Sequence, residues 1–480
     1  MDSRVCQFAW LCILIVLCSV GALFSQNWVM LNYCKERTSF NDQEKLLYPP
    51  LEEKFTYRPK SSAGSISNLS LYEQILCASI QGTPNSLEVL NVETKDTLWT
   101  FSLAESRGSM SFLVAQTGQL CFAGGQYGKG LYALDKTNGE PVWFKEIGSL
   151  YTKHLILDDE QAFILADSLY CIRIGDGSTI WSSDMTFQGT PAVDEKYVYL
   201  VGSYKIHILD KTNGEVKWSR PHPERGCAGI TVDDQCFYTL SNDSVLAYNK
   251  ETWDLKWHHV RPGDTLQVNC GNSLAITDDK LCFTIRNDVN GNGQLVTLDK
   301  TSGQFIWEHT FQGKYVFAPV IANGVVYVIP AAERALYGFD ITTGEQLFYD
   351  NTYRYRYQPI VANHMLYAQA GNQIIGFGNT ETHVNRTPKS TPEGLGLIVQ
   401  TYPNPFNATT TIRFTLMEDE QVTLRIYNHL GQEISTLLKE YRAAGEYQVK
   451  FDGSDLPSGL YFIDAQAGAV RSLTKCMLIK

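Results

Sequence analysis

The sequence lacks any concentration of positive charge. Its 40 lysines and arginines are outnumbered by 51 aspartates and glutamates, which gives a formal net charge of −11 over 480 residues. Nucleic acids and anionic membrane surfaces are recognised through basic patches, so this balance argues against both as partners. Apolar residues make up 44% of the chain, which is enough for a sizeable core, and the length exceeds that of one ordinary domain.

Cysteine motifs for metal binding are absent. None of the twelve cysteines forms a CxxC pair or a Cys/His cluster, which argues against zinc. Five cysteines fall in apolar stretches that read as strands, and we expect them to be small buried hydrophobes: Cys77, Cys121, Cys171, Cys236 and Cys282. Cys34, Cys227 and Cys270 lie in looser sequence, where two of them could pair in an oxidising compartment.

Signatures of nucleophilic or acid–base catalysis are also missing. The nine histidines are scattered, and none joins a recognisable Ser or Cys motif. Carboxylate pairs recur, at Asp158-Asp159, Asp233-Asp234 and Asp278-Asp279, but each occupies the same hairpin of a repeat. Recurrence at a turn indicates a structural role, so the sequence predicts no catalytic residue.

What the chain does contain is a repeat of about 40 residues, centred on Leu131–Trp143 (LYALDKTNGEPVW). Its other copies are Leu87–Trp99, Leu169–Trp181, Ile206–Trp218, Val245–Trp257, Leu295–Trp307 and Leu336–Phe348, the last with Phe in the Trp place. A period of this length is typical of propellers and solenoids.

The repeat unit has a direct physical interpretation. LYALD alternates as a half-buried strand, and Asp135 can cap the turn that follows it. Gly139 supplies a positive φ, and Trp143 opens the next strand with a flat side chain suited to packing between sheets. With the strand pair upstream of each turn, the unit makes four antiparallel strands, which is one propeller blade.

Seven turn units are explicit, and Gln358–Gly378 is an eighth that lacks its Trp strand. The N-terminal segment 26–66, with Lys54–Arg58 as a candidate strand, could complete this last blade and close the ring. We therefore predict an all-β fold with eight blades, with seven as the alternative.

These turns resemble the repeat of pyrroloquinoline-quinone-like (PQQ-like) β-propellers over Ser67–Asn379, that is, residues 67–379. The Gly-His and Trp-Asp signatures of WD40 repeats are absent. The resemblance implies a possible quinone and calcium site on the propeller axis. The chain has no adjacent Cys-Cys pair to cap a quinone ring and no long loops to enclose one, so PQQ is not expected.

The N-terminal segment carries an apolar run, Phe8–Phe24, behind a single Arg4. We interpret residues 1–25 as a secretory signal peptide, with an uncleaved anchor as the alternative. At the other end, residues 380–396 are rich in Thr, Pro and Gly and read as a linker.

Residues 397–480 form short alternating strands separated by turns, which predicts a small Ig-like β-sandwich. The expected strands are Thr411–Leu416, Val422–Tyr427, Glu446–Phe451, Gly459–Ala465 and Ser472–Ile479. This module resembles the C-terminal sorting domain (type A) of type IX secretion cargo. The motif residues are Tyr402, Pro403, Asn404, Pro405, Gly431, Gly459, Lys475 and Lys480.

The resemblance implies a Gram-negative bacterium and export through the periplasm by the type IX machinery, as a secreted or surface protein. On this basis we expect the propeller to be a non-catalytic binding or scaffold module for a protein or carbohydrate. The alternative is an extracellular enzyme, either a quinoprotein dehydrogenase or one acting on polysaccharide.

Two further features are candidate sites. Asp288, Asn290, Asn292 and Asp299 follow the spacing of an EF-hand-style calcium loop, and the alternative is an enlarged hairpin. Tyr353–Tyr357 (YRYRY) would place its tyrosines on one face of a strand and its arginines on the other. It is a candidate binding surface or an ordinary outer strand.

Overall fold

A computed structural model provides the architecture of the chain. It describes residues 39–60, 64–82, 84–103, 113–124, 130–147, 155–166, 168–183, 191–202, 204–222, 229–241, 244–261, 274–287, 291–380, 398–402, 406–416, 419–428, 432–443, 445–468 and 470–479. These residues are organised as strands and turns in two compact units, Met1–Glu381 and Thr382–Lys480. The apolar run Phe8–Phe24 lies outside the described residues, among which no helix is long and apolar enough to cross a membrane.

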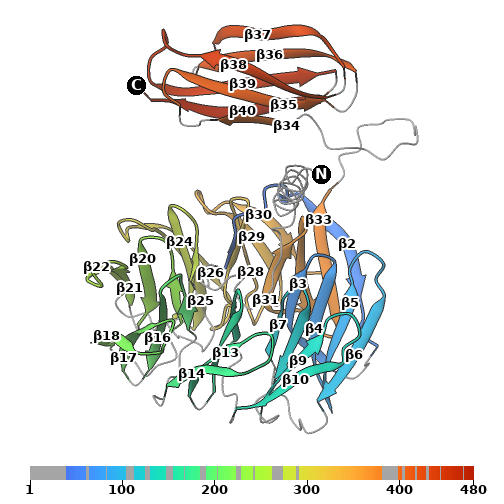
Figure 1. Cartoon of the computed structure of the whole chain (residues 1–480), viewed down its shortest axis with the longest axis vertical. Coiled ribbons are helices and arrows are strands. Elements are labelled where there is room, and N and C mark those ends of the chain that lie inside the picture. The colour runs from blue at the N-terminus through green and yellow to red at the C-terminus, as the bar shows by residue number, and fades with distance from the viewer. Residues whose placement is uncertain are drawn as a thin grey trace, which may run out of the picture. The chain divides into compact units, whose positions relative to one another are not determined.

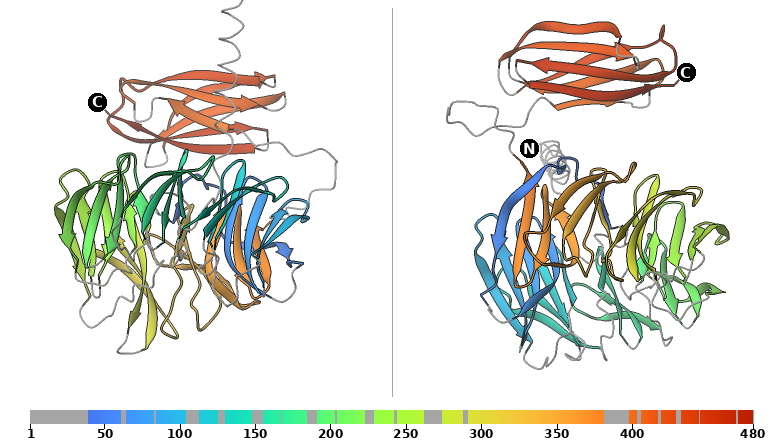
Figure 2. Two further views of the ribbon diagram at one scale, coloured as in Figure 1. Left: turned by 60° about the horizontal axis from the view of Figure 1, so that its bottom comes forward. Right: turned by 180° about the vertical axis from the view of Figure 1, so that it is seen from behind.

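The first unit is a β-propeller whose described strands form eight sheets arranged around a ring (Figures 1 and 2). Blades one to three contain β3 (Ser65–Tyr72), β4 (Ile75–Gln81), β5 (Asn85–Asn91), β6 (Thr97–Leu103); β7 (Leu113–Gln116), β8 (Leu120–Gly124), β9 (Gly130–Asp135), β10 (Pro141–Glu146); and β11 (Leu155–Asp158), β12 (Gln161–Leu165), β13 (Leu169–Arg173), β14 (Thr179–Ser183). Blades four to six contain β15 (Ala192–Val193), β16 (Tyr197–Gly202), β17 (Lys205–Asp210), β18 (Val216–Pro221); β19 (Ile230–Val232), β20 (Cys236–Leu240), β21 (Ser244–Asn249), β22 (Leu255–Val260); and β23 (Ala275–Ile276), β24 (Lys280–Asn287), β25 (Asn292–Asp299), β26 (Phe305–Phe311). The predicted eight-blade propeller is confirmed.

Blades seven and eight each take in a strand from the N-terminal segment. Blade seven contains β27 (Val320–Ala322), β28 (Val325–Val328), β29 (Leu336–Asp340) and β30 (Gln346–Asp350), and β1 (Phe40–Asn41) pairs in parallel with β27. Blade eight contains β31 (Tyr355–Ala362), β32 (Met365–Ala370), β33 (Gln373–Asn379) and β2 (Leu51–Tyr57), which pairs antiparallel with β33. The outer strand of the last blade therefore comes from the start of the propeller, and this pairing joins the two ends of the ring.

Burial follows strand order within a blade. First strands such as β11 are buried at every position, whereas fourth strands such as β10 expose most of theirs. The first strand is therefore packed on the inside of the ring and the fourth lies on its rim. Successive strands are antiparallel, so two kinds of turn share one end of the ring: those joining first to second strands and those joining third to fourth strands. We call this the turn end; the other connections lie at the opposite end.

The second unit has two sheets, ordered β34-β35-β38 and β37-β36-β39-β40. Its strands are β34 (Ile398–Tyr402), β35 (Thr409–Leu416), β36 (Glu420–Asn428), β37 (Glu433–Arg442), β38 (Gly445–Asp452), β39 (Gly459–Ala467) and β40 (Val470–Leu478). Both sheets contribute to one apolar cluster, for example through Phe414 and Ile426, which is consistent with the predicted sandwich. β34 and β37 were not among the strands expected from the sequence; β37 is mostly exposed, so it lacks the apolar alternation that marks a strand.

Candidate functional site

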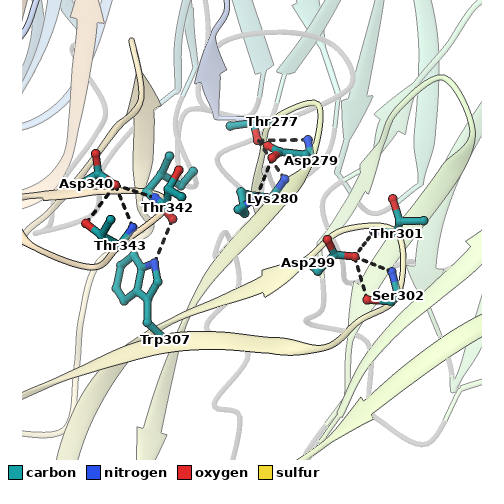
Figure 3. Close-up of polar contacts among 11 residues, drawn as sticks. Thr277, Asp279, Lys280, Asp299, Thr301, Ser302, Trp307, Asp340, Thr342 and Thr343 are labelled. Atoms are coloured by element: carbon teal, nitrogen blue, oxygen red, sulfur yellow. Dashed lines mark hydrogen bonds and ion pairs between the residues drawn. The ribbon is translucent and has the colours of Figure 1, made fainter. Parts of the chain in front are cut away.

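The turn end of the propeller is built from the recurring aspartate turns. In blade six, Asp299 Oδ1 accepts hydrogen bonds from the backbone N–H of Thr301 at 3.1 Å and of Ser302 at 2.8 Å (Figure 3). The Ser302 hydroxyl donates to the same oxygen at 2.7 Å and is the main cause of the lowered pKa of Asp299. Asp340 in blade seven accepts the equivalent N–H bonds from Thr342 and Thr343. These aspartates are turn caps, as predicted for Asp135.

The interpretation of Asp288–Asp299 as one calcium loop needs correction. Asn292 and Asp299 lie at opposite ends of the extended strand β25, roughly 20 Å apart at the rise of a β-strand. They cannot ligate the same ion, and Asp299 is occupied by its own turn. The hairpin alternative accounts for this part of the repeat; Asp288 and Asn290 lie outside the described residues.

The tryptophan that ends each repeat joins neighbouring blades. Trp307 Nε1 donates to the backbone carbonyl of Ile341 in the next blade at 2.9 Å (Figure 3). Trp257 bonds the Lys300 carbonyl in the same way, at 3.1 Å. The indole also covers the glycine of the neighbouring turn: a Cβ at Gly303 would lie 2.5 Å from the Trp257 ring. The same contact of a tryptophan with the glycine of the next blade recurs at Gly139, Gly177, Gly214 and Gly344.

Lysines that directly follow the turn-capping Asp or Asn make a second set of inter-blade contacts. Lys300 Nζ lies 2.9 Å from Asp233 Oδ2 in the preceding blade, and Lys250 Nζ lies 3.3 Å from Asp194 Oδ2. Lys211 pairs with Asp158 in the same manner. Asp233, one of the carboxylates predicted to be structural, therefore caps its own hairpin and also binds the neighbouring blade.

Burial and hydrogen bonding act in opposite directions on these aspartates. Burial by itself raises the pKa of Asp233, but the Lys300 ammonium and the backbone N–H of Cys236 outweigh it, and the net pKa is below its usual range. For Asp194, burial is likewise outweighed by the N–H groups of Lys196 and Tyr197. Both carboxylates are therefore ionised at neutral pH and fixed in place.

A cavity of about 590 Å³ opens at the turn end beside blades four, five and six. We call it the turn-end cavity. The N-terminal segment also lines it, through Phe40 of β1 and Asp42. Its charged lining consists of Asp42, Asp194, Glu195, Asp233, Asp234, Asp278, Lys250 and Lys300. The two lysines are already paired with Asp194 and Asp233, so the lining carries an excess of negative charge.

The acidic residues of the lining come from the same hairpin position in three neighbouring blades. In the first hairpin of each of these three blades, one residue holds the turn and the next lines the cavity. Asp233 Oδ1 accepts the N–H groups of Gln235 and Cys236, while Asp234 is exposed to the cavity. Glu195 and Asp278 are exposed at the matching place in blades four and six. The carboxylate pairs were predicted to be structural, which fits Asp233, but the exposed position that Asp234 and Asp278 share at the cavity was not foreseen from the sequence.

A basic surface lies at the opposite end of the ring. The backbone N–H of Tyr355 donates to the Arg334 carbonyl at 2.9 Å, which brings Arg334 beside Arg354 and Arg356. The two other arginines lower the pKa of Arg334, their positive charges being the main cause. Tyr355 is buried and both flanking arginines are exposed, as the alternation of YRYRY predicted. We call these three side chains the arginine surface; no basic stripe was visible in the sequence because its members come from two separate segments of the chain.

In the second unit, three of the expected motif residues lie in described strands. Tyr402 ends β34, Gly459 begins β39 and Lys475 lies in β40. Pro403, Asn404, Pro405, Gly431 and Lys480 lie outside the described residues. Phe406, which directly follows the YPNP run, is buried, and its N–H and carbonyl bond the backbone of Met477 and Ile479. This part of the motif fixes the C-terminal strand to the core.

The five cysteines expected to be buried are buried: Cys77, Cys121, Cys171, Cys236 and Cys282. Cys34, Cys227 and Cys270 lie outside the described residues.

Comparison with known families gives two matches. Residues 165–289 and 285–386 match the PQQ-like repeat family described as outer membrane protein assembly factor BamB. Residues 400–480 match the secretion system C-terminal sorting domain. A comparison with curated proteins found no match.

Solved structures resemble the propeller at low sequence identity. BamB from Moraxella catarrhalis is 17% identical with a TM-score of 0.53, over 68% of this chain and 99% of that chain. A europium-containing methanol dehydrogenase is 10% identical with a TM-score of 0.60, over 74% and 98%. The quinohemoprotein alcohol dehydrogenase from Comamonas testosteroni is 12% identical with a TM-score of 0.60, over 78% and 83%. These similarities concern the fold alone, which serves both an assembly factor and dehydrogenases.

Proposed function

Because the chain joins a PQQ-like β-propeller to the C-terminal sorting domain of a type IX secretion system, we propose that it is a non-catalytic binding protein that works outside the cell. The sorting domain supplies the address, at the cell surface or in the medium, and the propeller supplies the binding site. The observation that carries the proposal is the turn-end cavity, a concave site on a rigid ring.

The lining of the cavity favours a positively charged ligand. Six carboxylates face two lysines, and both lysines are engaged with Asp194 and Asp233. Glu195, Asp234 and Asp278 are exposed at successive blades, so they can contact several cationic groups of one ligand at once. We propose a lysine- or arginine-rich peptide segment as the ligand class.

Quinone chemistry has less support at this site. A bound quinone with calcium would need acidic side chains on the axis with oxygens directed at the ion. Asp194 and Asp233 are instead directed at lysines of neighbouring blades, and β1 covers the inner edge of β27. These residues do not fit such a group, and we derive no step through it.

The test is binding of a fluorescently labelled penta-lysine peptide to the purified protein, followed by anisotropy at low and physiological salt. The double variant Asp234→Asn/Asp278→Asn should bind at least about tenfold more weakly, since it removes two exposed cavity charges. Asp159→Asn is the matched control, because Asp159 is exposed at the same hairpin position in blade three and does not line the cavity. Equal affinity in all three proteins would reject the site, and so would the absence of binding. An absorbance spectrum of the same sample with a bound chromophore would reject the non-catalytic assignment.

The arginine surface favours a second ligand at the opposite end, an anionic polysaccharide. Three guanidinium groups brought together on an acidic protein are suited to carboxylate or sulfate groups, which arginine binds in bidentate fashion. Binding of dextran sulfate should weaken in Arg354→Gln/Arg356→Gln and stay unchanged in Asp234→Asn/Asp278→Asn. Uncharged dextran is the polymer control, and equal binding of both polymers would reject this assignment.

A further inference from the structure

Two buried cysteines meet at the interface between blades one and two. Cys77 lies in β4 and Cys121 in β8, and their Sγ atoms are 3.3 Å apart although the residues are separated by 44 positions in the chain. Both side chains are fully buried. A disulfide has an S–S length of about 2.05 Å, so closing the bond requires an approach of about 1.2 Å.

The other buried cysteines of the propeller have different neighbours. Cys282 Sγ lies 3.0 Å from the Thr297 hydroxyl, and Cys236 Sγ lies 3.7 Å from Lys256 Nζ. Cys171 Sγ lies 3.7 Å from Gln161. Burial as a small apolar residue therefore accounts for these three, whereas the sulfur–sulfur contact of Cys77 and Cys121 is an additional feature.

The surroundings of the pair include a buried cation. Lys136 lies over the Tyr72 ring at 4.0 Å and donates to the Thr117 carbonyl at 3.2 Å. Burial raises the pKa of the Cys77 thiol, while Lys136 and Ser70 act in the opposite direction by favouring the thiolate. In the closed ring both thiols are shielded from solvent, so oxidation belongs to the stage at which the two blades are still coming together.

The sorting domain places this pair on a route out of the cytosol. Disulfides form and persist in the compartments outside the cytosol, where protein and small-molecule disulfides are available as oxidants. We propose that Cys77 and Cys121 form an inter-blade disulfide during export, and that it locks blade one to blade two.

The reaction is thiol–disulfide exchange with a disulfide donor. The Cys77 thiolate, after losing its proton to solvent, attacks one sulfur of the donor and displaces a donor thiolate, leaving a mixed disulfide. The Cys121 thiolate then attacks the Cys77 sulfur and displaces the second donor thiolate. Two thiols lose two protons and two electrons, and the donor disulfide is reduced to two thiols.

The bond would act near the closure of the ring. Blade one is the neighbour of blade eight, which is completed by β2 from the N-terminal segment. If the ring opens at this point, blade one has to separate from blade eight or from blade two. The disulfide would prevent the separation from blade two. The expected result is slower unfolding and resistance to proteases outside the cell.

The experiment uses the full chain, purified from the periplasm or the medium of an expressing Gram-negative host. Free thiols are blocked with N-ethylmaleimide in denaturant, and the digest is analysed by mass spectrometry without reduction. We expect a cross-linked pair of peptides containing Cys77 and Cys121. Recovery of both cysteines as N-ethylmaleimide adducts, or linked to other cysteines, would overturn the proposal.

A thermal measurement gives an independent readout. Dithiothreitol should lower the melting temperature of the wild-type protein by about 5 °C or more. The shift should vanish in Cys77→Ala/Cys121→Ala and persist in Cys282→Ala, which removes an equally buried thiol without touching the pair. A shift that persists in the double variant would assign the effect to another disulfide. Should the double variant fail to fold, the peptide map of the wild-type protein decides the question alone.

Discussion

At the scale of single residues, the propeller depends on a pairing between a tryptophan and a glycine in adjacent blades. Gly303 and Gly344 have φ of +70° and +75°, and the indoles of Trp257 and Trp307 lie directly against them. Blade five shows what happens when the glycine is missing. Trp253 takes its place with φ +61°, and the Trp218 ring of blade four packs against it at 6.1 Å. The contact between the blades is therefore kept, because the Trp253 ring takes the place of the glycine as the surface against which Trp218 packs.

Gly303→Ala should lower the free energy of unfolding by about 2–4 kcal/mol. The change places an alanine at positive φ, which costs about 1 kcal/mol, and puts its Cβ 2.5 Å from the Trp257 ring, which must move. Gly324→Ala is the control, because Gly324 has φ +76° and no atom within 4 Å of the added Cβ. Urea denaturation should show only the smaller cost there; equal losses in both variants would refute the role of the indole.

Asp233→Asn should lower the free energy of unfolding by about 2 kcal/mol at pH 7, because it leaves the partly buried Lys300 without its counter-charge. Since the pKa of Asp233 in the folded protein is below its ordinary value, its stabilising contribution is present above about pH 4 and is lost as the pH falls through the folded value. The difference from wild type should therefore shrink between pH 5 and pH 3.

Denaturation curves collected across that range measure this difference directly. Asp278→Asn, at an exposed place in the next blade, provides the comparison and should show little change at any of these pH values. A constant difference between wild type and Asp233→Asn down to pH 3 would contradict the charge-based explanation.

At the scale of secondary-structure elements, the deciding feature is β2. The strand completes blade eight and places Phe55 opposite Gly376, after the same register shift that precedes the tryptophan in other blades. Lys95 of blade one has a positive φ, and its Nζ lies over the Phe55 ring. In other blades the residue at this turn position is a glycine that packs against the indole of the preceding blade. Phe55 is thus the missing anchor of the eighth repeat, although it lies about 300 residues before the strand it pairs with.

Phe55→Ala should cost about 3 kcal/mol, within the range for truncating a buried phenylalanine, because the side chain is 4% exposed and packs in the core shared with blade eight. Phe305→Ala provides the comparison, since Phe305 also lies on an outer strand but is 50% exposed. The measurement is urea denaturation followed by tryptophan fluorescence. Similar losses for the two variants would show that β2 does not hold the ring closed.

At the scale of the whole molecule, the chain consists of two compact units with separate cores. Each has its own strands and apolar core. The link to the type IX machinery comes from the family of the sorting domain and not from any feature of the propeller. The separation means that removing one unit should leave the fold of the other intact.

A chain ending at Glu381 should fold with an unchanged melting transition of the propeller but should no longer reach the cell surface or medium of its type IX-competent host. Fractionation and immunoblotting would find it retained inside the cell envelope. The control is Met477→Ala in the full chain, an exposed apolar side chain of β40 whose truncation should leave export unchanged. Export of the truncated chain at wild-type levels would contradict the assignment of the address to residues 400–480.

The repeat and the sorting domain could be predicted from the sequence alone, which favoured eight blades and left seven as the alternative. Each of these rests on local patterns: an aspartate that caps the next turn, an alternating strand, a tryptophan at a fixed distance, a motif of adjacent residues. Local chemistry of this kind can be read without knowing which segments meet in space.

Which residues share a site depends on how the blades pack, and this could not be read from the sequence. Glu195, Asp234 and Asp278 gather at one cavity because three blades present the same hairpin position to it. Arg334 joins Arg354 and Arg356 through the backbone hydrogen bond from Tyr355 to the Arg334 carbonyl. The same holds for the contact of Cys77 with Cys121 and for Phe55, since both depend on how blades pack around a closed ring. The calcium-loop prediction was wrong because it relied on spacing alone. The spacing fitted a loop, but β25 pairs with β24 and β26, so Asn292 and Asp299 lie at the two ends of an extended strand.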